Sequence, residues 1–222
     1  MHQRGRQYLA FTLIEVFVVI GILGILAALL FPALKSAKAR GKAIACVSQL
    51  KQIGVASLAY AEESNGRFPV ATRDTNRFLS PLQPVSRALA SPRLFLCPAD
   101  TERSAGTNLA LLDRTNTSYF VSFSARANQP QSILMGDRNI TRIIARPGVP
   151  GTNLIRITGR VMLFRTNTFG WWRDMHQGKG NLLLADGSAR PTDAQKLNAQ
   201  TAVQPDETFG WYIPNGDSIS TP

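Results

Sequence analysis

The chain has 222 residues, 44% of them hydrophobic and 18% charged, and this length accommodates one domain with an anchor rather than several domains. Its formal net charge is +11, from 25 Lys and Arg against 14 Asp and Glu, and the excess is spread along the chain. The two His and two Cys residues form no His-x-x-x-His or Cys-x-x-Cys pair, so the sequence does not support a metal site such as zinc.

The first predicted element is an apolar segment, residues 11–34, which follows a leader containing Arg4 and Arg6. As a helix with a rise of ~1.5 Å per residue, it reaches ~36 Å and can cross a hydrocarbon core of ~30 Å. Its single charge is Glu15. A carboxylate inside an apolar span costs ~2.5 kcal/mol or more without a partner, so its presence indicates a function.

The sequence Phe11-Thr-Leu-Ile-Glu15, after a basic leader and before a long apolar run, resembles the N-terminus of type IV prepilins and type II secretion pseudopilins. The resemblance implies cleavage between Ala10 and Phe11 by a membrane protease, the prepilin peptidase, and methylation of the new Phe11 amine. Family members usually carry Gly where this chain has Ala10. Because Ala is the next-smallest residue, we expect processing to survive.

Processing would leave a cationic Phe11 amine at membrane depth. The Glu15 carboxylate of a neighbouring subunit would neutralise that amine at close range, where a low dielectric strengthens the attraction. The implied partners are the prepilin peptidase, other pilin or pseudopilin subunits and an inner-membrane assembly platform. The alternative role of Glu15 is to extend to the lipid headgroups.

Three other interpretations of residues 11–34 stay open. A cleaved secretory signal has an apolar core of ~7–15 residues, which is shorter than this one. A plain signal anchor explains the length and the flanking charge, but it does not explain Glu15. The third alternative is a buried helix of a soluble protein.

Arg4 and Arg6 place the leader, residues 1–10, in the cytoplasm, so residues 35–222 are expected to form an exported head beyond an inner-membrane span. An exported domain permits a disulfide between the two cysteines, Cys46 and Cys97. The sequence does not establish that they lie close together. Cys46 on a helix would serve equally well as a small buried hydrophobic residue.

Beyond Pro32, an amphipathic pattern continues the helix to about Glu63, where Ser64-Asn65-Gly66 provides a stop signal. Pro32 lacks an amide donor and is expected to kink or locally melt the helix. The next stretch, residues 64–118, is rich in loops and contains one predicted short helix at residues 82–90.

Alternating apolar residues predict strands over residues 118–125, 132–136, 141–145, 154–158 and 160–164. The segment 181–190 predicts a hairpin in which Asp186-Gly187 forms a two-residue turn with positive backbone angles. The expected fold is therefore α+β and pilin-like. In it, the second half of the long N-terminal helix packs on a head with a mostly antiparallel sheet.

Motifs within the head extend the resemblance. The segments 46–54, 60–69 and 95–100, and the pattern His176, nine residues, Asp186-Gly187, resemble a branch of prepilin-like proteins abundant in planctomycetes. Members often carry His after that Gly, where this chain has Ser188. We interpret Asp186 as the start of the turn and His176 as a hydrogen-bonding partner of the backbone beside it. No candidate nucleophile accompanies them, so no catalytic residue is predicted.

No cofactor is expected. Calcium is kept as an alternative, with Glu62, Glu63 and Asn65 or with Asp100 and Glu102 as ligands, although the chain has no Asp-x-Asp-x-Asp loop. Seven arginines between Arg138 and Arg173 form either a solvated sheet face or a basic face for nucleic acid or an acidic polysaccharide. Nucleic acid is not favoured, because the basic residues are not interleaved with aromatic ones.

Two functional classes follow. The first is a non-catalytic subunit of a type II secretion pseudopilus or of a type IV pilus-like filament, both of which use this N-terminus. The second is a membrane-anchored exported binding protein, for DNA or an acidic glycan, that does not polymerise. Replacement of Glu15 distinguishes them, because only the first class needs its charge for assembly.

Overall fold

The computed structural model describes residues 12–69, 85, 88, 89, 91–108, 112, 115–145, 152–156, 159–164, 167–204, 206 and 208–213. By its contacts the chain divides into two units, Met1–Arg40 and Gly41–Pro222. The leader, the expected cleavage point between Ala10 and Phe11, and most of the short helix expected at residues 82–90 lie outside the described residues.

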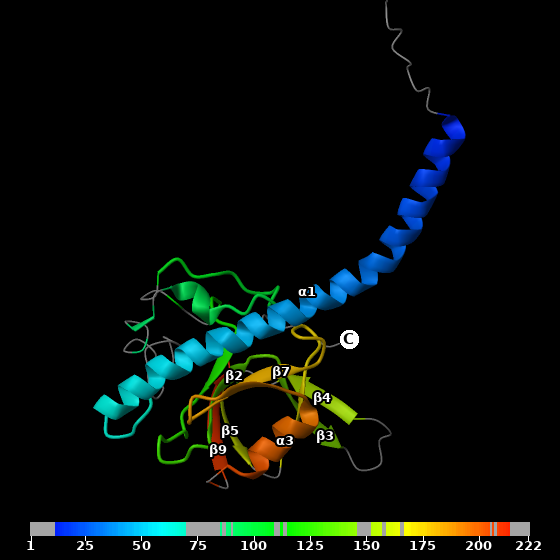
Figure 1. The fold of residues 1–222 in the computed structure, drawn as a ribbon. Helices are drawn as coiled ribbons and strands as arrows, with labels where there is room; N and C mark the ends of the chain where they lie inside the picture. Colours follow the sequence, from blue (N-terminus) through cyan, green and yellow to red (C-terminus); the bar gives the residue numbers. More distant parts are fainter. Residues whose placement is uncertain are drawn as a thin grey trace, which may run out of the picture. The chain divides into compact units, whose positions relative to one another are not determined.

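Helix α1 spans Leu13–Glu63 and continues through Pro32, as expected, without the local melting that was one of the two effects predicted there (Figure 1). Proline removes one backbone hydrogen bond, and the helical turns on both sides retain theirs. The helix ends where the sequence predicts. Asn65 and Gly66 adopt left-handed φ angles of 54° and 73°, and the Gly66 amide donates to the carbonyl of Ala61 over 2.8 Å.

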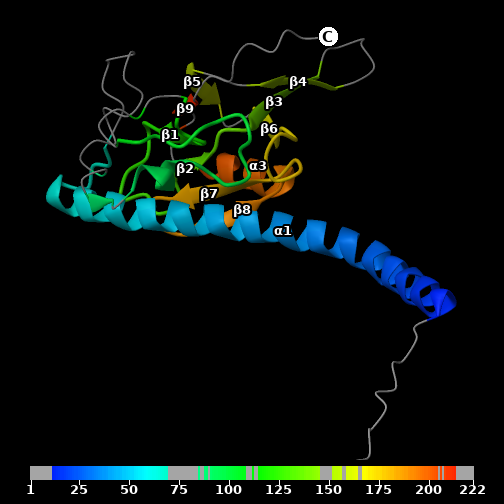
Figure 2. The same cartoon turned by 90° about the horizontal axis from the view of Figure 1, so that it is seen from above.

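The head consists of two sheets whose strand pairs are all antiparallel (Figures 1 and 2). A six-stranded sheet has the order β5-β9-β1-β2-β7-β8, and a three-stranded sheet has the order β4-β3-β6. The strands are β1 (Tyr119–Ser122), β2 (Ile133–Asp137), β3 (Ile140–Ala145), β4 (Thr152–Arg156), β5 (Gly159–Phe164), β6 (Thr168–Trp171), β7 (Gly180–Leu184), β8 (Ala189–Thr192) and β9 (Thr208–Ile213). Two short helices, η1 (Pro92–Phe95) and α3 (Ala194–Ala202), complete the described elements.

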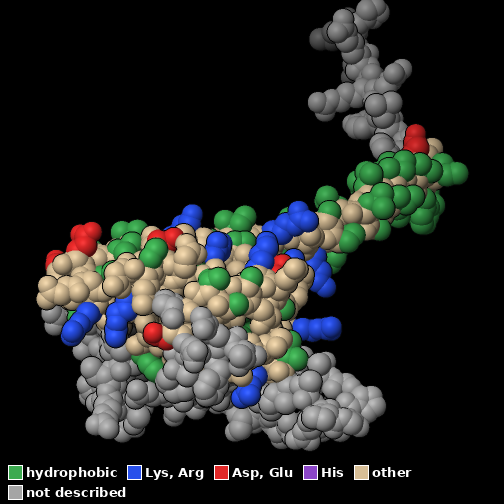
Figure 3. Space-filling view, turned by 90° about the horizontal axis from the view of Figure 1, so that it is seen from below, with side chains coloured by type: hydrophobic (Ala, Val, Ile, Leu, Met, Phe, Trp, Pro, Cys, Tyr) green, Lys and Arg blue, Asp and Glu red, His purple; other side chains and the backbone are tan. Residues whose placement is uncertain are grey.

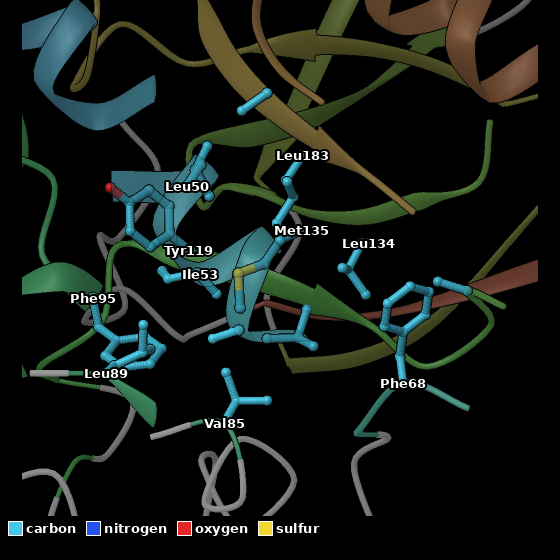
Figure 4. Close-up of a cluster of buried hydrophobic side chains, with 14 of the residues drawn as sticks. Leu50, Ile53, Phe68, Val85, Leu89, Phe95, Tyr119, Leu134, Met135 and Leu183 are labelled. Atoms are coloured by element: carbon cyan, nitrogen blue, oxygen red, sulfur yellow. The ribbon is translucent and has the colours of Figure 1, made fainter. Parts of the chain in front are cut away.

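The central strands bury side chains on both faces of the larger sheet. Tyr119 of β1 and Leu183 of β7 join one apolar cluster with residues of α1 such as Leu50 (Figure 4). The neighbouring residues Phe120 and Leu182 point to the opposite face and join a second cluster. That second cluster also contains Phe169 of β6, Leu197 of α3 and Trp211 of β9. The expected α+β fold with a long helix and antiparallel strands is therefore confirmed, with a second layer covering the far face.

The β7–β8 hairpin lies close against α1. A Cβ atom on Gly54 of α1 would lie 2.7 Å from Cδ1 of Leu183, and a Cβ atom on Gly187 would lie 2.7 Å from Cδ1 of Leu58. At Gly54 the close neighbour is buried and the Gly187 backbone follows at 3.5 Å, so a larger residue would hold the hairpin away from the helix. At Gly187 the close neighbour is the end of the half-buried Leu58 side chain, which can move. This packing within the head places the hairpin turn directly on the helix surface.

The predicted two-residue turn at Asp186-Gly187 is wrong in its type. The Leu184 amide donates to the Ser188 carbonyl over 2.9 Å, and the Gly187 amide donates to the Leu184 carbonyl over 3.0 Å. The loop therefore has three residues, and only Gly187, with φ of 80°, adopts a positive angle. This is the three-residue hairpin in which a turn is followed by a left-handed glycine. Asp186 instead accepts a hydrogen bond from the Ser188 amide.

The five predicted strands correspond to β1–β5, with bounds that differ by a few residues. Strand β6, helix α3 and strand β9 were not predicted. Helix α3 has only 9 residues, and its start signal is Asp193, whose side chain accepts a hydrogen bond from the Lys196 amide. Strand β9 pairs with β1 and β5, so its formation depends on partners distant in sequence.

Candidate functional site

The first candidate site is the exposed apolar surface of α1 between residues 13 and 34. Fifteen large hydrophobic side chains in this segment are between 47% and 77% exposed. Figure 3 shows apolar side chains covering the visible surface of this part of the helix. Among the described residues, α1 is the one helix that is long and apolar enough to cross a membrane. An apolar surface of this extent requires lipid or other protein to cover it.

Glu15 lies in the first turn of α1 and forms a capping box with Thr12. Its Oε2 accepts hydrogen bonds from the Thr12 amide over 2.8 Å and from the Thr12 hydroxyl over 2.6 Å. In return, the Glu15 amide is 3.4 Å from Oγ1 of Thr12. The carboxylate thereby gives the Thr12 amide a partner, whereas the Glu15 amide also donates to the Thr12 carbonyl over 3.1 Å.

Sequence reasoning missed this partner of Glu15. The signal was present, because Thr12-x-x-Glu15 before an apolar run is the sequence pattern of a capping box. Both hydrogen bonds from Thr12 reach the same oxygen, Oε2. A carboxylate accepts through two oxygens, so Glu15 can retain Thr12 and bind a cation at the same time.

The second candidate site is a buried cluster in the head around His176. Cys46 of α1 and Cys97, which follows η1, form a disulfide with a Cα–Cα distance of 5.1 Å. Nε2 of His176 lies 3.2 Å from Sγ of Cys97. The structure therefore brings together three of the residues singled out in the sequence, from three separate segments.

The expected hydrogen bond from His176 to the backbone is replaced by side-chain partners. Its Nε2 lies 3.1 Å from Nδ2 of Asn181 and 3.3 Å from Oδ2 of Asp137. Asn181 also donates two hydrogen bonds to Oδ2 of Asp137, from its backbone amide over 2.7 Å and from its side-chain Nδ2 over 2.9 Å. Asp137 was not predicted as a site residue. The sequence feature that could have indicated it is the presence of a charged residue at the end of the otherwise apolar strand β2.

Burial controls the protonation of this pair. It raises the pKa of Asp137 to about 8, although the hydrogen bonds from Asn181 act in the opposite direction. Burial also lowers the pKa of His176. Both shifts favour the uncharged form of the side chain, as expected for ionisable groups removed from water.

Arg138 forms a separate buried ion-pair network beside Asp137. It donates to Asp100 through Nε and Nη2, both over 2.7 Å, and to Glu102 over 2.8 Å. Its Nη1 lies 3.5 Å from Asp174. The assignment of Arg138 to a sheet face that contacts solvent or nucleic acid is therefore wrong, because its side chain is fully buried. The carboxylates of Asp100 and Glu102, considered as calcium ligands, instead bind this guanidinium.

Asp186 has hydrogen-bond partners of its own. Asp186 caps its own loop through Ser188, and its amide donates to the carbonyl of Pro130. The pattern of His176, nine residues, Asp186-Gly187 therefore links two local features, the disulfide cluster and the hairpin loop.

No family model, no curated protein and no solved structure matches the chain.

Proposed function

We propose that this protein is a non-catalytic subunit of a filament of the type IV pilus or type II secretion pseudopilus class. The observation that carries the proposal is the exposed apolar helix surface at residues 13–34 with one carboxylate, Glu15, in its first turn. A helix of this kind is stable when lipid covers it before assembly and when neighbouring helices cover it afterwards.

In this proposal the prepilin peptidase removes residues 1–10, and the apolar helix anchors the mature chain in the inner membrane with the head exported. The disulfide between Cys46 and Cys97 supports export, because disulfides persist in oxidising compartments. The alternative function, an anchored protein that binds DNA or an acidic glycan, loses part of its basis because Arg138 is buried in ion pairs.

Glu15 would pair with the Phe11 amine of the next subunit. The hydrogen bonds from Thr12 orient the carboxylate at the start of the helix, where the amine of a neighbouring chain would reach it. Pairing would neutralise two charges that are costly in an apolar environment. Because each carboxylate would meet the amine of the next chain, the pairing would also define the axial offset between subunits.

Three variants test this role in cells that express the assembly machinery. Glu15→Leu removes both the charge and the hydrogen-bond acceptor, whereas Glu15→Gln removes the charge and keeps an oxygen for Thr12. The matched control is Glu62→Leu, which removes an exposed carboxylate near the other end of the same helix. The measurement is the fraction of protein in sheared fibres or crosslinked oligomers relative to the membrane fraction.

We expect both Glu15 variants to insert normally and to enter filaments poorly, and Glu62→Leu to resemble the wild type. If Glu15→Gln assembles normally while Glu15→Leu does not, helix capping rather than charge pairing explains the residue. Normal assembly of both variants would favour the anchored binding protein.

A further inference from the structure

The disulfide cluster of the head contains the ligand set of a metal site in a closed form. Sγ of Cys46, Sγ of Cys97 and a ring nitrogen of His176 all lie within 4.8 Å of one another. Two cysteines and one histidine with a water in the fourth position is a known arrangement for zinc. In the disulfide state the sulfur atoms are bonded to each other, so they do not act as thiolate ligands.

The backbone conformation at His176 is an unfavourable one, which indicates that the fold requires the imidazole in its observed position. His176 and Gln177 adopt φ angles of 45° and 56°, and Gly178 follows with 79°. Left-handed conformations are unfavourable for residues with a Cβ atom and persist only where the surrounding structure imposes them. In this conformation the imidazole is directed at the disulfide, and the His176 side chain is only 4% exposed.

A buried acidic group lies on the same side of the imidazole. Oδ2 of Asp137 is 3.3 Å from Nε2 of His176, and Asp137 is fully buried. Its other oxygen, Oδ1, has no hydrogen-bond partner among the residues that the structure describes. A buried polar atom without a hydrogen bond is uncommon in a native fold, and this one leaves a polar position open beside the imidazole.

We propose that reduction of the Cys46–Cys97 disulfide opens a metal site in the head, in which the two thiolates and His176 bind one thiophilic divalent ion such as Zn²⁺. This inference concerns the head alone and does not depend on filament assembly. The disulfide state would then be the closed form of the site.

The chemistry is a two-electron reduction followed by ligand exchange. A trialkylphosphine breaks the S–S bond and is oxidised to the phosphine oxide with the oxygen of one water, while two thiols form. The metal ion then displaces the two thiol protons and binds neutral His176. Tetrahedral zinc requires S···S separations of ~3.8 Å and S···N separations of ~3.6 Å. Loss of the S–S bond allows the first, and the 3.2 Å between Cys97 and His176 is close to the second.

The test uses the full-length protein in detergent, with and without phosphine reduction, titrated with Co²⁺ and then with Zn²⁺. Thiolate-to-cobalt absorption reports sulfur coordination, and displacement by Zn²⁺ gives the zinc affinity. We expect one ion per reduced chain and none per oxidised chain. Near-UV circular dichroism must show that the reduced head is still folded, because an unfolded dithiol also binds metals.

His176→Gln keeps both thiols and removes the imidazole, so we expect at least about a tenfold loss of affinity after reduction. The matched control is His2→Gln, which removes the other histidine of the chain and should leave the affinity unchanged. Three results would each overturn the proposal: equal affinity in His176→Gln, binding by the oxidised protein, or loss of the folded signal on reduction.

Discussion

The contact between the hairpin and α1 gives a prediction whose size follows from the structure. Gly187 has φ of 80°, which costs a residue with a Cβ atom ~1–2 kcal/mol. A Cβ atom there would lie 2.7 Å from Cδ1 of Leu58, so this side chain would have to move. Overpacking of a core typically costs ~1–3 kcal/mol, and the lower end of this range applies here because Leu58 and Gly187 are only half-buried. For Gly187→Val we therefore expect a loss of ~2–3 kcal/mol in the free energy of unfolding.

Gly66→Val is the matched control, because Gly66 has a similar φ of 73° and its nearest neighbour, Cβ of Ala127, would be at an ordinary distance of 3.8 Å. It should therefore show the backbone cost alone, ~1–2 kcal/mol. Unfolding of the full-length protein in detergent, followed by near-UV circular dichroism, measures both. A loss of 1 kcal/mol lowers Tm by ~2–4 °C at this chain size.

A double variant separates the packing part of the effect. Leu58→Ala creates space below Gly187, so adding Gly187→Val to that background should cost less than it costs in the wild type. Equal losses in the two backgrounds, or equal losses at Gly187 and Gly66, would show that the close approach of hairpin and helix does not limit residue size here.

Two further predictions concern the N-terminus and the buried ion pairs. Mass spectrometry of protein from cells with active prepilin peptidase should show an N-terminal, methylated Phe11, and an intact leader would contradict the proposed processing. Burial alone would raise the pKa of Asp100, but the hydrogen bonds and charge of Arg138 outweigh it and hold that pKa below its ordinary value. The stability that Asp100 contributes should therefore be present above about pH 4 and be lost as the pH falls further, whereas Asp100→Asn should be less stable at neutral pH and lack this part of the acid dependence. Parallel acid unfolding curves for the two proteins would exclude the ion pair as a source of stability.

The sequence by itself determined the elements whose signals are local. The apolar run and the amphipathic pattern that follows specify one helix, and Asn65-Gly66 ends it because these residues tolerate left-handed angles. Alternation of apolar residues located five of the strands, since side-chain direction along a strand depends only on neighbouring residues. The capping box of Thr12 and Glu15 was also encoded locally, although it was not recognised.

Tertiary structure alone decided the partners of the polar groups in the head. Arg138 is paired with Asp100, 38 residues away, and the sequence spacing of the arginines gave no indication of this burial. His176 meets Cys97 across a separation of 79 residues and lies 3.3 Å from Oδ2 of Asp137, and its sequence motif indicated neither partner. Chain topology sets such pairings, because the order of strands in a sheet brings distant residues together. A single sequence, which records only neighbours along the chain, does not contain that order.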